Sequence, residues 1–236
     1  MSTSSLKFLT CVFAALAGLT ACGDERSSGD DPTHELMMRA VETSRRAGRY
    51  YAEERLDSAI QLNFDALNMF LEVLKTDSTN VKAMSAVGFS YMMAADYDPA
   101  IPWFRRALSV NPSLAEVRRQ LGIAQIATGQ VPQGKQNINE AISQVDNPQA
   151  RYLTLQTLDK IGTEAHQIGV IHGKEDEPEQ MNNQFRYSLA VLTFAHEIGG
   201  PDSALGRKIA TYALELGDEI TAEQFSAAYS LGDVSH

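Results

Sequence analysis

The chain has 236 residues, of which 44% are hydrophobic and 21% charged. Its 20 basic and 30 acidic side chains give a formal net charge of −10 with histidine neutral. This acidic balance argues against a nucleic-acid-binding protein and against a protein that lies on anionic lipid, because both surfaces repel a negatively charged chain.

The N-terminus carries a short apolar segment. Lys7 precedes a mostly apolar run over residues 8 to 21, which is too short to span a bilayer. Residues 19 to 22 read Leu-Thr-Ala-Cys, and a polar stretch follows. The segment resembles a bacterial lipoprotein signal peptide of residues 1 to 21, which implies cleavage before Cys22 and transfer of diacylglycerol to its thiol. An ordinary secretory signal with a chance cysteine is the alternative.

Processing before Cys22 would leave an acidic chain on a tether. Cleavage removes Lys7 and Cys11, so the mature chain has 19 basic and 30 acidic side chains and a net charge of −11. The lipid consumes the remaining thiol, and no disulfide can form. Residues 22 to 33 are rich in glycine, serine and acidic residues, so we expect a flexible tether that reaches roughly 15 to 20 Å on average.

The residues after Cys22 bear on the choice of membrane. In the sorting rule known for enteric bacteria, an aspartate directly after the lipidated cysteine keeps a lipoprotein in the inner membrane. Here that position is Gly23, and Asp24 comes one residue later. The sequence therefore favours the periplasmic leaflet of the outer membrane over the inner membrane.

Residues 81 to 114 fit a 34-residue helical-hairpin template. The constrained positions hold Gly88, Tyr91, Ala100, Phe104, Ala107 and Pro112. Small residues let two helices approach, and large side chains at intervals of three, four and seven form a buried face. Asp98-Pro99 predicts the start of the second helix, and Asn111-Pro112 predicts its end. The segment resembles a tetratricopeptide repeat (TPR), which implies a grooved solenoid of stacked helix pairs that usually binds other proteins.

The pattern extends one unit in each direction with lower fidelity. Residues 115 to 148 keep the template in phase, with Gly134 where alanine is usual. Upstream, a second helix is in phase but the first helix fits poorly, so residues 55 to 75 are alternatively one longer helix that caps the array. Three units span about residues 47 to 148, within a predicted array of residues 34 to 148.

Residues 149 to 236 leave the template but keep a helical pattern. The sequence predicts a first helix, a loop from Gly173 to Glu179, and helices over about 181–198 and 202–216. A last short helix would begin at a capping box of Thr221 and Gln224. The second and third of these helices form a diverged repeat or belong to a separate helical domain. The predicted fold class is all-α, a TPR-type solenoid of helical hairpins with additional C-terminal helices.

No familiar catalytic constellation is visible in the sequence. His196-Glu197 lacks the second histidine of a zinc-protease helix, and His166 and His172 have no spacing that suggests a shared site. A Gly-x-Ser-x-Gly element is missing, and no cysteine survives as a nucleophile. We therefore expect no enzyme activity, no metal and no tightly bound cofactor.

The TPR resemblance assigns the binding groove to the first helix of each unit. The candidate protein-binding residues are Lys82, Ser85, Phe89, Met92, Met93, Arg119, Gln120, Ile123 and Ile126. Their apolar members would face outward from the core, unless the chain's own C-terminal helix covers them. Glu116 stands where the carboxylate clamp of some TPRs needs a basic group, which argues against a receptor for chaperone tails.

Together these features predict a lipoprotein scaffold. It would be anchored through Cys22 at the periplasmic face of a bacterial envelope and would bind another envelope protein or peptide, as TPR lipoproteins that serve secretins or outer-membrane assembly do. Two alternatives stay open. One is an enzyme or enzyme regulator with its site in residues 149 to 236, and the other is a homo-oligomeric structural lipoprotein.

Overall fold

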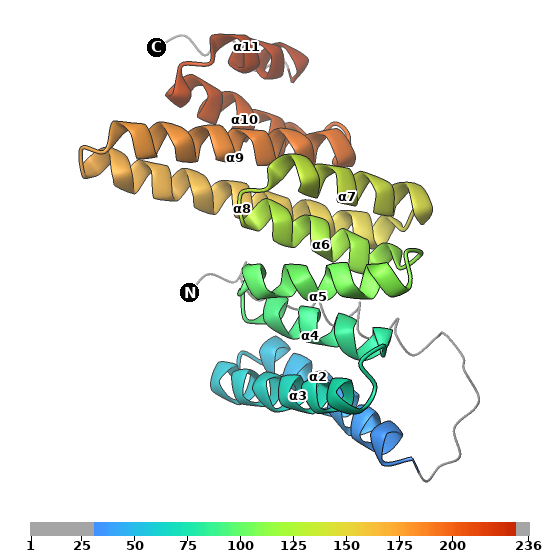
Figure 1. Cartoon of the computed structure of the whole chain (residues 1–236). Helices are drawn as coiled ribbons and strands as arrows, with labels where there is room; N and C mark the ends of the chain where they lie inside the picture. The colour runs from blue at the N-terminus through green and yellow to red at the C-terminus, as the bar shows by residue number, and fades with distance from the viewer. Residues whose placement is uncertain (1–30, 230–236) are drawn as a thin grey trace. The chain divides into compact units, whose positions relative to one another are not determined.

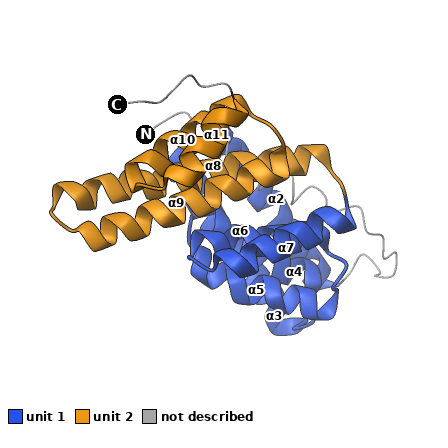
Figure 2. Ribbon diagram, turned by 90° about the horizontal axis from the view of Figure 1, so that it is seen from above, with its two compact units in different colours: residues 1–145 blue, residues 146–236 orange. Residues whose placement is uncertain are grey.

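The computed structural model describes residues 31 to 229, and within this range it holds ten α-helices and no strand (Figure 1). The fold is an all-α solenoid of TPR-type helical hairpins with additional C-terminal helices, as the sequence predicts. The predicted signal peptide and Cys22 lie outside the described residues. No helix over residues 31 to 229 is both long and apolar enough to cross a membrane. The chain divides into two compact units between Val145 and Asp146 (Figure 2).

The first unit consists of three antiparallel hairpins. They are formed by α2 (Pro32–Ala52) with α3 (Leu56–Thr76), α4 (Val81–Met93) with α5 (Tyr97–Val110), and α6 (Ala115–Ala127) with α7 (Val131–Gln144). Successive hairpins also touch, since α3 packs on α4 and α5 packs on α6. Each hairpin therefore buries its apolar faces against its neighbours in the chain, which is the packing of a solenoid.

The repeat is visible in the turns as well as in the helices. Ala95 and Gly129 follow the first helix of their hairpins, stand 34 positions apart, and both have a positive φ, of 56° and 83°. Asn80 begins α4 with a side-chain oxygen that accepts from the backbone N–H of Ala83 at 2.9 Å. The predicted end of α5 is confirmed, because the helix stops at Val110 before the Asn-Pro pair.

Small residues set how closely the helices of a hairpin approach. A Cβ atom added to Gly88 would lie 2.5 to 2.9 Å from three atoms of the Phe104 ring. In the next hairpin Gly122 and Gly134 face each other, and a Cβ atom on either would lie within 2.7 Å of the other's carbonyl oxygen. The predicted role of small residues at the helix crossing is confirmed, with a phenyl ring as the partner in one hairpin and backbone in the other.

The first hairpin differs from the predicted unit. Helices α2 and α3 each have 21 residues, against 13 or 14 for α4 to α7. The hairpin starts at Pro32 and not near residue 47, because Asp31 caps α2 and proline suits a first turn. The last two residues of the predicted tether are thus helical. The alternative reading of residues 55 to 75 as one long helix is confirmed.

The second unit contains two further hairpins. They are α8 (Pro148–Lys174) with α9 (Pro178–Gly199), and α10 (Ser203–Leu216) with α11 (Glu219–Ala228). Residues 183–198 and 202–216 are therefore not the two halves of one hairpin, since α9 packs mainly along α8. Gly162 and Gly169 of α8 leave room for Leu192 and Phe185 of α9.

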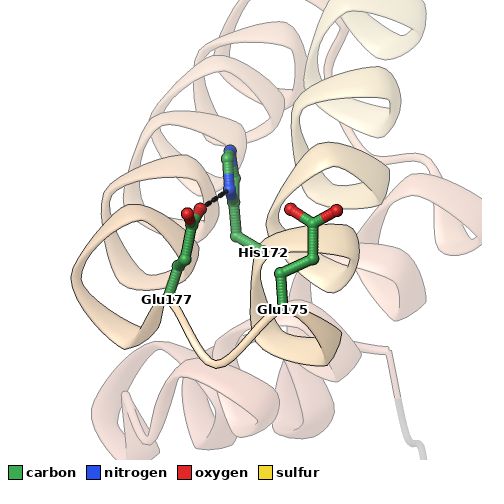
Figure 3. A group of neighbouring side chains, drawn as sticks. All are labelled: His172, Glu175 and Glu177. Atoms are coloured by element: carbon green, nitrogen blue, oxygen red, sulfur yellow. Dashed lines mark hydrogen bonds and ion pairs between the residues drawn. The ribbon is translucent and has the colours of Figure 1, made fainter.

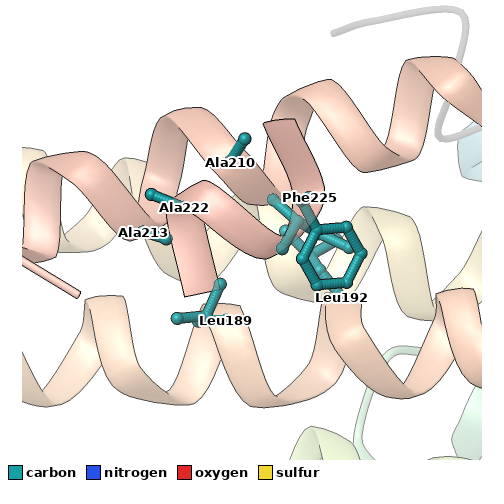
Figure 4. Packing of buried hydrophobic residues seen from close by; sticks show 7 residues of the cluster. Leu189, Leu192, Ala210, Ala213, Ala222 and Phe225 are labelled. Carbon is teal, nitrogen blue, oxygen red and sulfur yellow. The ribbon is translucent and has the colours of Figure 1, made fainter. Parts of the chain in front are cut away.

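Helices α9, α10 and α11 share one apolar core (Figure 4). Its large side chains come from all three helices, namely Leu189 and Leu192 of α9, Ile209 of α10 and Phe225 of α11, while Ala210 and Ala213 of α10 lie between them. The core therefore joins the second hairpin of this unit to the first.

Two predicted boundaries in this unit are wrong. The loop is confined to residues 175 to 177, because α8 continues to Lys174 and Pro178 opens α9. The capping box at Thr221 is also incorrect. Asp218 caps α11 instead, since its carboxylate accepts from the backbone N–H of Thr221 at 3.1 Å and from its hydroxyl at 2.7 Å.

The Gly88 contact gives a test of the helix crossing. We expect Gly88→Ala to destabilise the protein, because overpacking against the buried Phe104 ring costs about 1 to 3 kcal/mol, more than the roughly 1 kcal/mol that alanine gains in helix propensity. Chemical denaturation of the wild type, both single variants and Gly88→Ala/Phe104→Leu would measure this. The double variant should lose less than the sum of the single losses; additive losses would contradict the contact.

Candidate functional site

The nine predicted groove residues lie on α4 and α6, the first helices of the second and third hairpins. Only Lys82 is exposed. The other eight are buried, namely Ser85, Phe89, Met92, Met93, Arg119, Gln120, Ile123 and Ile126. The expectation that Phe89, the two methionines and the two isoleucines present an open apolar surface is therefore corrected, while partner binding at these positions stays a prediction.

The composition of α4 explains why its predicted groove face is buried. The helix is apolar on nearly all sides and carries one charged side chain, Lys82, and a helix that is apolar all round belongs inside a protein. It packs against α3, α5 and α6. Phe89 is fully buried, and its ring meets the Phe104 ring edge to face with centroids 5.3 Å apart. The two phenylalanines therefore share one core, whereas the repeat template buries Phe104 between the helices and places Phe89 in the groove.

The polar groove residues of α6, Arg119 and Gln120, both pair with Glu116 of the same helix. The buried Arg119 guanidinium donates from Nε to Oε2 of Glu116 at 2.9 Å and from Nη2 to Oε1 of the same carboxylate. Gln120 Nε2 donates to Glu116 Oε1 at 3.0 Å. A fork of this kind satisfies a buried guanidinium. Glu116, whose acidity excluded a carboxylate clamp, holds Arg119 and Gln120 in place.

The second unit contains an open pocket of about 340 Å³ between the N-terminal half of α8, the end of α9 and the start of α10. Its lining residues are Tyr152, Leu155, Gln156, Asp159, Ala195, Gly199, Gly200, Asp202, Ala204, Leu205 and Lys208. The sequence predicts the helix break at residues 199 to 201 that frames the pocket. It gives no signal that Lys208 meets Asp159, because these residues are 49 positions apart and only the tertiary fold joins them.

The charged groups in the wall of this pocket are paired within the protein. Lys208 forms an ion pair with Asp159 and donates to Thr163 Oγ1 at 3.2 Å. Asp202 accepts from the backbone N–H groups of Ala204 and Leu205 at 2.7 and 3.0 Å, as the cap of α10.

Aliphatic side chains form part of the lining of the pocket. Leu155 and Leu205 contribute aliphatic surface, whereas Ala195 is fully buried. Tyr152 stands at the rim with 54% of its surface exposed, and its hydroxyl accepts a hydrogen bond from Gln156 Nε2 at 2.7 Å.

A stack of three rings lies next to the pocket and fixes α10. The buried His166 ring of α8 lies between Phe185 of α9 and Tyr212 of α10, with centroid distances of 4.7 and 3.5 Å. His166 Nε2 is 2.6 Å from Glu215 Oε2. Burial raises the pKa of the Tyr212 phenol, and the carboxylates of Glu215 and Asp159 raise it further. The ring stack and the contact between His166 and Glu215 hold α10, the helix that carries Lys208, against the α8–α9 hairpin.

One group of side chains has donor types that could hold a metal ion. His172, Glu175 and Glu177, at the turn between α8 and α9, offer ligand atoms that lie within 4.8 Å of one another (Figure 3). The sequence does not predict this group, because the pattern of residues 173 to 179 indicates a loop. All three residues reach solvent, and His172 Nδ1 is hydrogen-bonded to Glu177 Oε2 at 2.6 Å, so the contact also serves to close the turn.

Comparisons with known proteins give low similarities. No protein-family model matches the chain, and no curated protein matches it. The solved structure of MamA is similar with a TM-score of 0.42 and 16% identity, over 74% of this chain and 88% of MamA. PilF of Pseudomonas aeruginosa has a TM-score of 0.42 and 13% identity, over 87% of this chain and 80% of PilF. The TPR domain of P58(IPK) has a TM-score of 0.38 and 14% identity, over 84% and 61%. Values this low give the chain neither a family nor a function.

The burial of Phe89 leads to a stability prediction. We expect Phe89→Ala to cost about 3 to 5 kcal/mol, the range for removal of a buried aromatic ring. An open groove position would cost much less. Denaturant titration would measure the loss, with the half-exposed Val110 as control, since Val110→Ala should change stability by less than about 0.5 kcal/mol. Equal effects of the two variants would show that Phe89 does not belong to the core.

Proposed function

We propose that this chain is a non-enzymatic scaffold that is anchored by lipid at Cys22, faces the periplasm of a bacterial envelope and binds another envelope protein. The observation that carries the proposal is the architecture. Hairpins that pack only on their neighbours in the chain form an extended surface, and proteins of this construction commonly use that surface to hold a partner.

Surface chemistry supports a protein partner. Ile60 and Phe64 lie four residues apart on one face of α3, and each is 57% exposed. The rim of the pocket in the second unit exposes Tyr152 to a similar degree. Apolar side chains that gather on a surface mark contact sites more often than single ones do. The acidic net charge of the chain speaks against nucleic acid as the partner.

The membrane attachment rests on the sequence around Cys22. An apolar segment, the residues Leu-Thr-Ala-Cys and a polar stretch follow one another, and α2 begins only ten positions after Cys22, at Pro32. A short connection of this kind would hold the folded units close to the membrane surface. The absence of an aspartate directly after Cys22 favours the outer membrane.

Site-specific photo-crosslinking in living cells tests the scaffold function. The photoreactive p-benzoylphenylalanine would replace the exposed Lys82 of α4 in the full chain, and the exposed Arg105 of α5 would serve as the control position. We expect one discrete crosslinked product from Lys82 and none from Arg105. A product with the mass of two copies of this chain, or no product from any exposed position on the hairpins, would overturn a scaffold for another protein.

Lipid anchoring gives a separate prediction. Cys22→Ser should abolish processing before residue 22 and the attachment of lipid, because the thiol is the acceptor of the lipid and no other cysteine follows such a motif. Mass spectrometry of the mature N-terminus of the wild-type protein decides the matter, with Cys11→Ser as the control that should leave processing unchanged. An N-terminus elsewhere, or Cys22 without acyl mass, would reject the anchor.

A further inference from the structure

We infer that the pocket between α8, α9 and α10 binds an aromatic side chain of the partner protein. The inference rests on the proposed scaffold function and names the contact through which one partner would be held. It concerns the second unit alone, since every lining residue lies between Tyr152 and Lys208.

The pairing of the charges decides which chemistry fits. Lys208 is neutralised by Asp159, and the Asp202 carboxylate is committed to the backbone N–H groups that begin α10. An anionic ligand would have to displace Asp159 from Lys208 or be buried beside the Asp159 and Asp202 carboxylates, and both cost free energy. The aliphatic surface that the pocket offers comes from the half-buried Leu155 and Leu205. A neutral, apolar group is therefore the occupant that the pocket favours.

The exposed Tyr152 favours an aromatic group as the occupant of the pocket. The Tyr152 ring stands at the opening and is more than half exposed. An aromatic side chain that enters beside it gains an aromatic pair in addition to the area it buries. The volume of about 340 Å³ lies at the lower end of the range for binding pockets, roughly 300 to 1,000 Å³. This size suits an anchoring side chain with its adjacent backbone better than a large cofactor.

Polar groups around the opening suit the backbone of a peptide. Each carboxylate can accept several hydrogen bonds, so Asp159 and Asp202 can accept from backbone N–H groups of the partner while they keep their present contacts. Anchors of this kind, an aromatic side chain in a formed pocket with polar groups around it, dominate the binding energy of many interfaces.

The pocket is also held in one shape. The His166 stack fixes α10 against α8, and a Cβ atom on Gly199 would lie 2.9 Å from the Leu155 methyl groups, so the end of α9 sits directly on α8. A preformed pocket does not have to be ordered by its ligand, which lowers the cost of binding.

A capped amino acid tests the pocket without knowledge of the partner. The probe is N-acetyl-4-fluoro-phenylalanine amide, and its fluorine NMR signal would be followed as the purified full chain in detergent is added. The exposed Ala204 would be changed to Trp to fill the pocket, and the exposed Ala227 of α11 would be changed to Trp as the matched control. We expect Ala204→Trp to weaken probe binding by about tenfold or more and Ala227→Trp to leave it unchanged, with equal melting temperatures.

Three outcomes would overturn the inference. One is equal probe binding by the wild type and Ala204→Trp, and another is equal competition by N-acetyl-glutamate amide, which would indicate a site for a charged ligand. The third concerns the crosslink from position 82 in cells. We expect Ala204→Trp to weaken this crosslink and Ala227→Trp to leave it unchanged, so an unchanged crosslink in Ala204→Trp would contradict the inference. If Ala204→Trp abolishes probe binding but leaves the crosslink intact, the scaffold function stands and the pocket is not the partner's anchor. A missing crosslink in the wild type would instead count against the scaffold function itself.

Discussion

The close approach of antiparallel helices at small residues is the constraint on which the hairpins depend. In the α4–α5, α6–α7 and α8–α9 hairpins a glycine faces a group that fills the space, as with Gly88 and the Phe104 ring, or Gly162 and Leu192. A Cβ atom at these positions would force the facing side chain or the helix to shift, because protein interiors are close-packed. The same device recurs in the 13- and 14-residue helices of the first unit and in the longer α8–α9 hairpin.

The central hairpin of the first unit packs against a hairpin on each side, and this accounts for its composition. A terminal hairpin packs on one side only, whereas α4 packs on α3, α5 and α6. The composition of α4 fits this environment, because Met84, Val87, Phe89 and Met92 lie around the helix and all four are buried. The apolar positions that a general repeat pattern assigns to a binding groove are here buried, whereas Lys82 is exposed. The buried side chains therefore stabilise the solenoid.

The sequence predicts what depends on local patterns and misses what depends on contacts across long separations. The helix end at Asn111-Pro112 and the close crossing at Gly88 follow from local patterns, and both are confirmed. The start of α11 was missed because both Asp218 and Thr221 are good caps, and only the geometry shows which carboxylate or hydroxyl accepts. The pocket could not be predicted, since it requires Asp159 and Lys208 to meet across 49 positions. The burial of Phe89 could have been anticipated from the nearly uncharged composition of α4.

Paired charges explain how an acidic chain can still offer an apolar site. The chain carries ten more acidic than basic side chains, yet the cationic Lys208 beside the pocket is held by Asp159 and Thr163, and the capping carboxylate of Asp202 faces backbone N–H groups. Each polar group is thus satisfied by a neighbour that also fixes a helix end or a helix pair. Asp159 and Lys208 neutralise each other, and the remaining charge of the pocket is the Asp202 carboxylate, which the backbone N–H groups of α10 stabilise. If the pocket binds a partner as we propose, the shape of one side chain would select that partner, and the negative charge of the chain would disfavour acidic proteins.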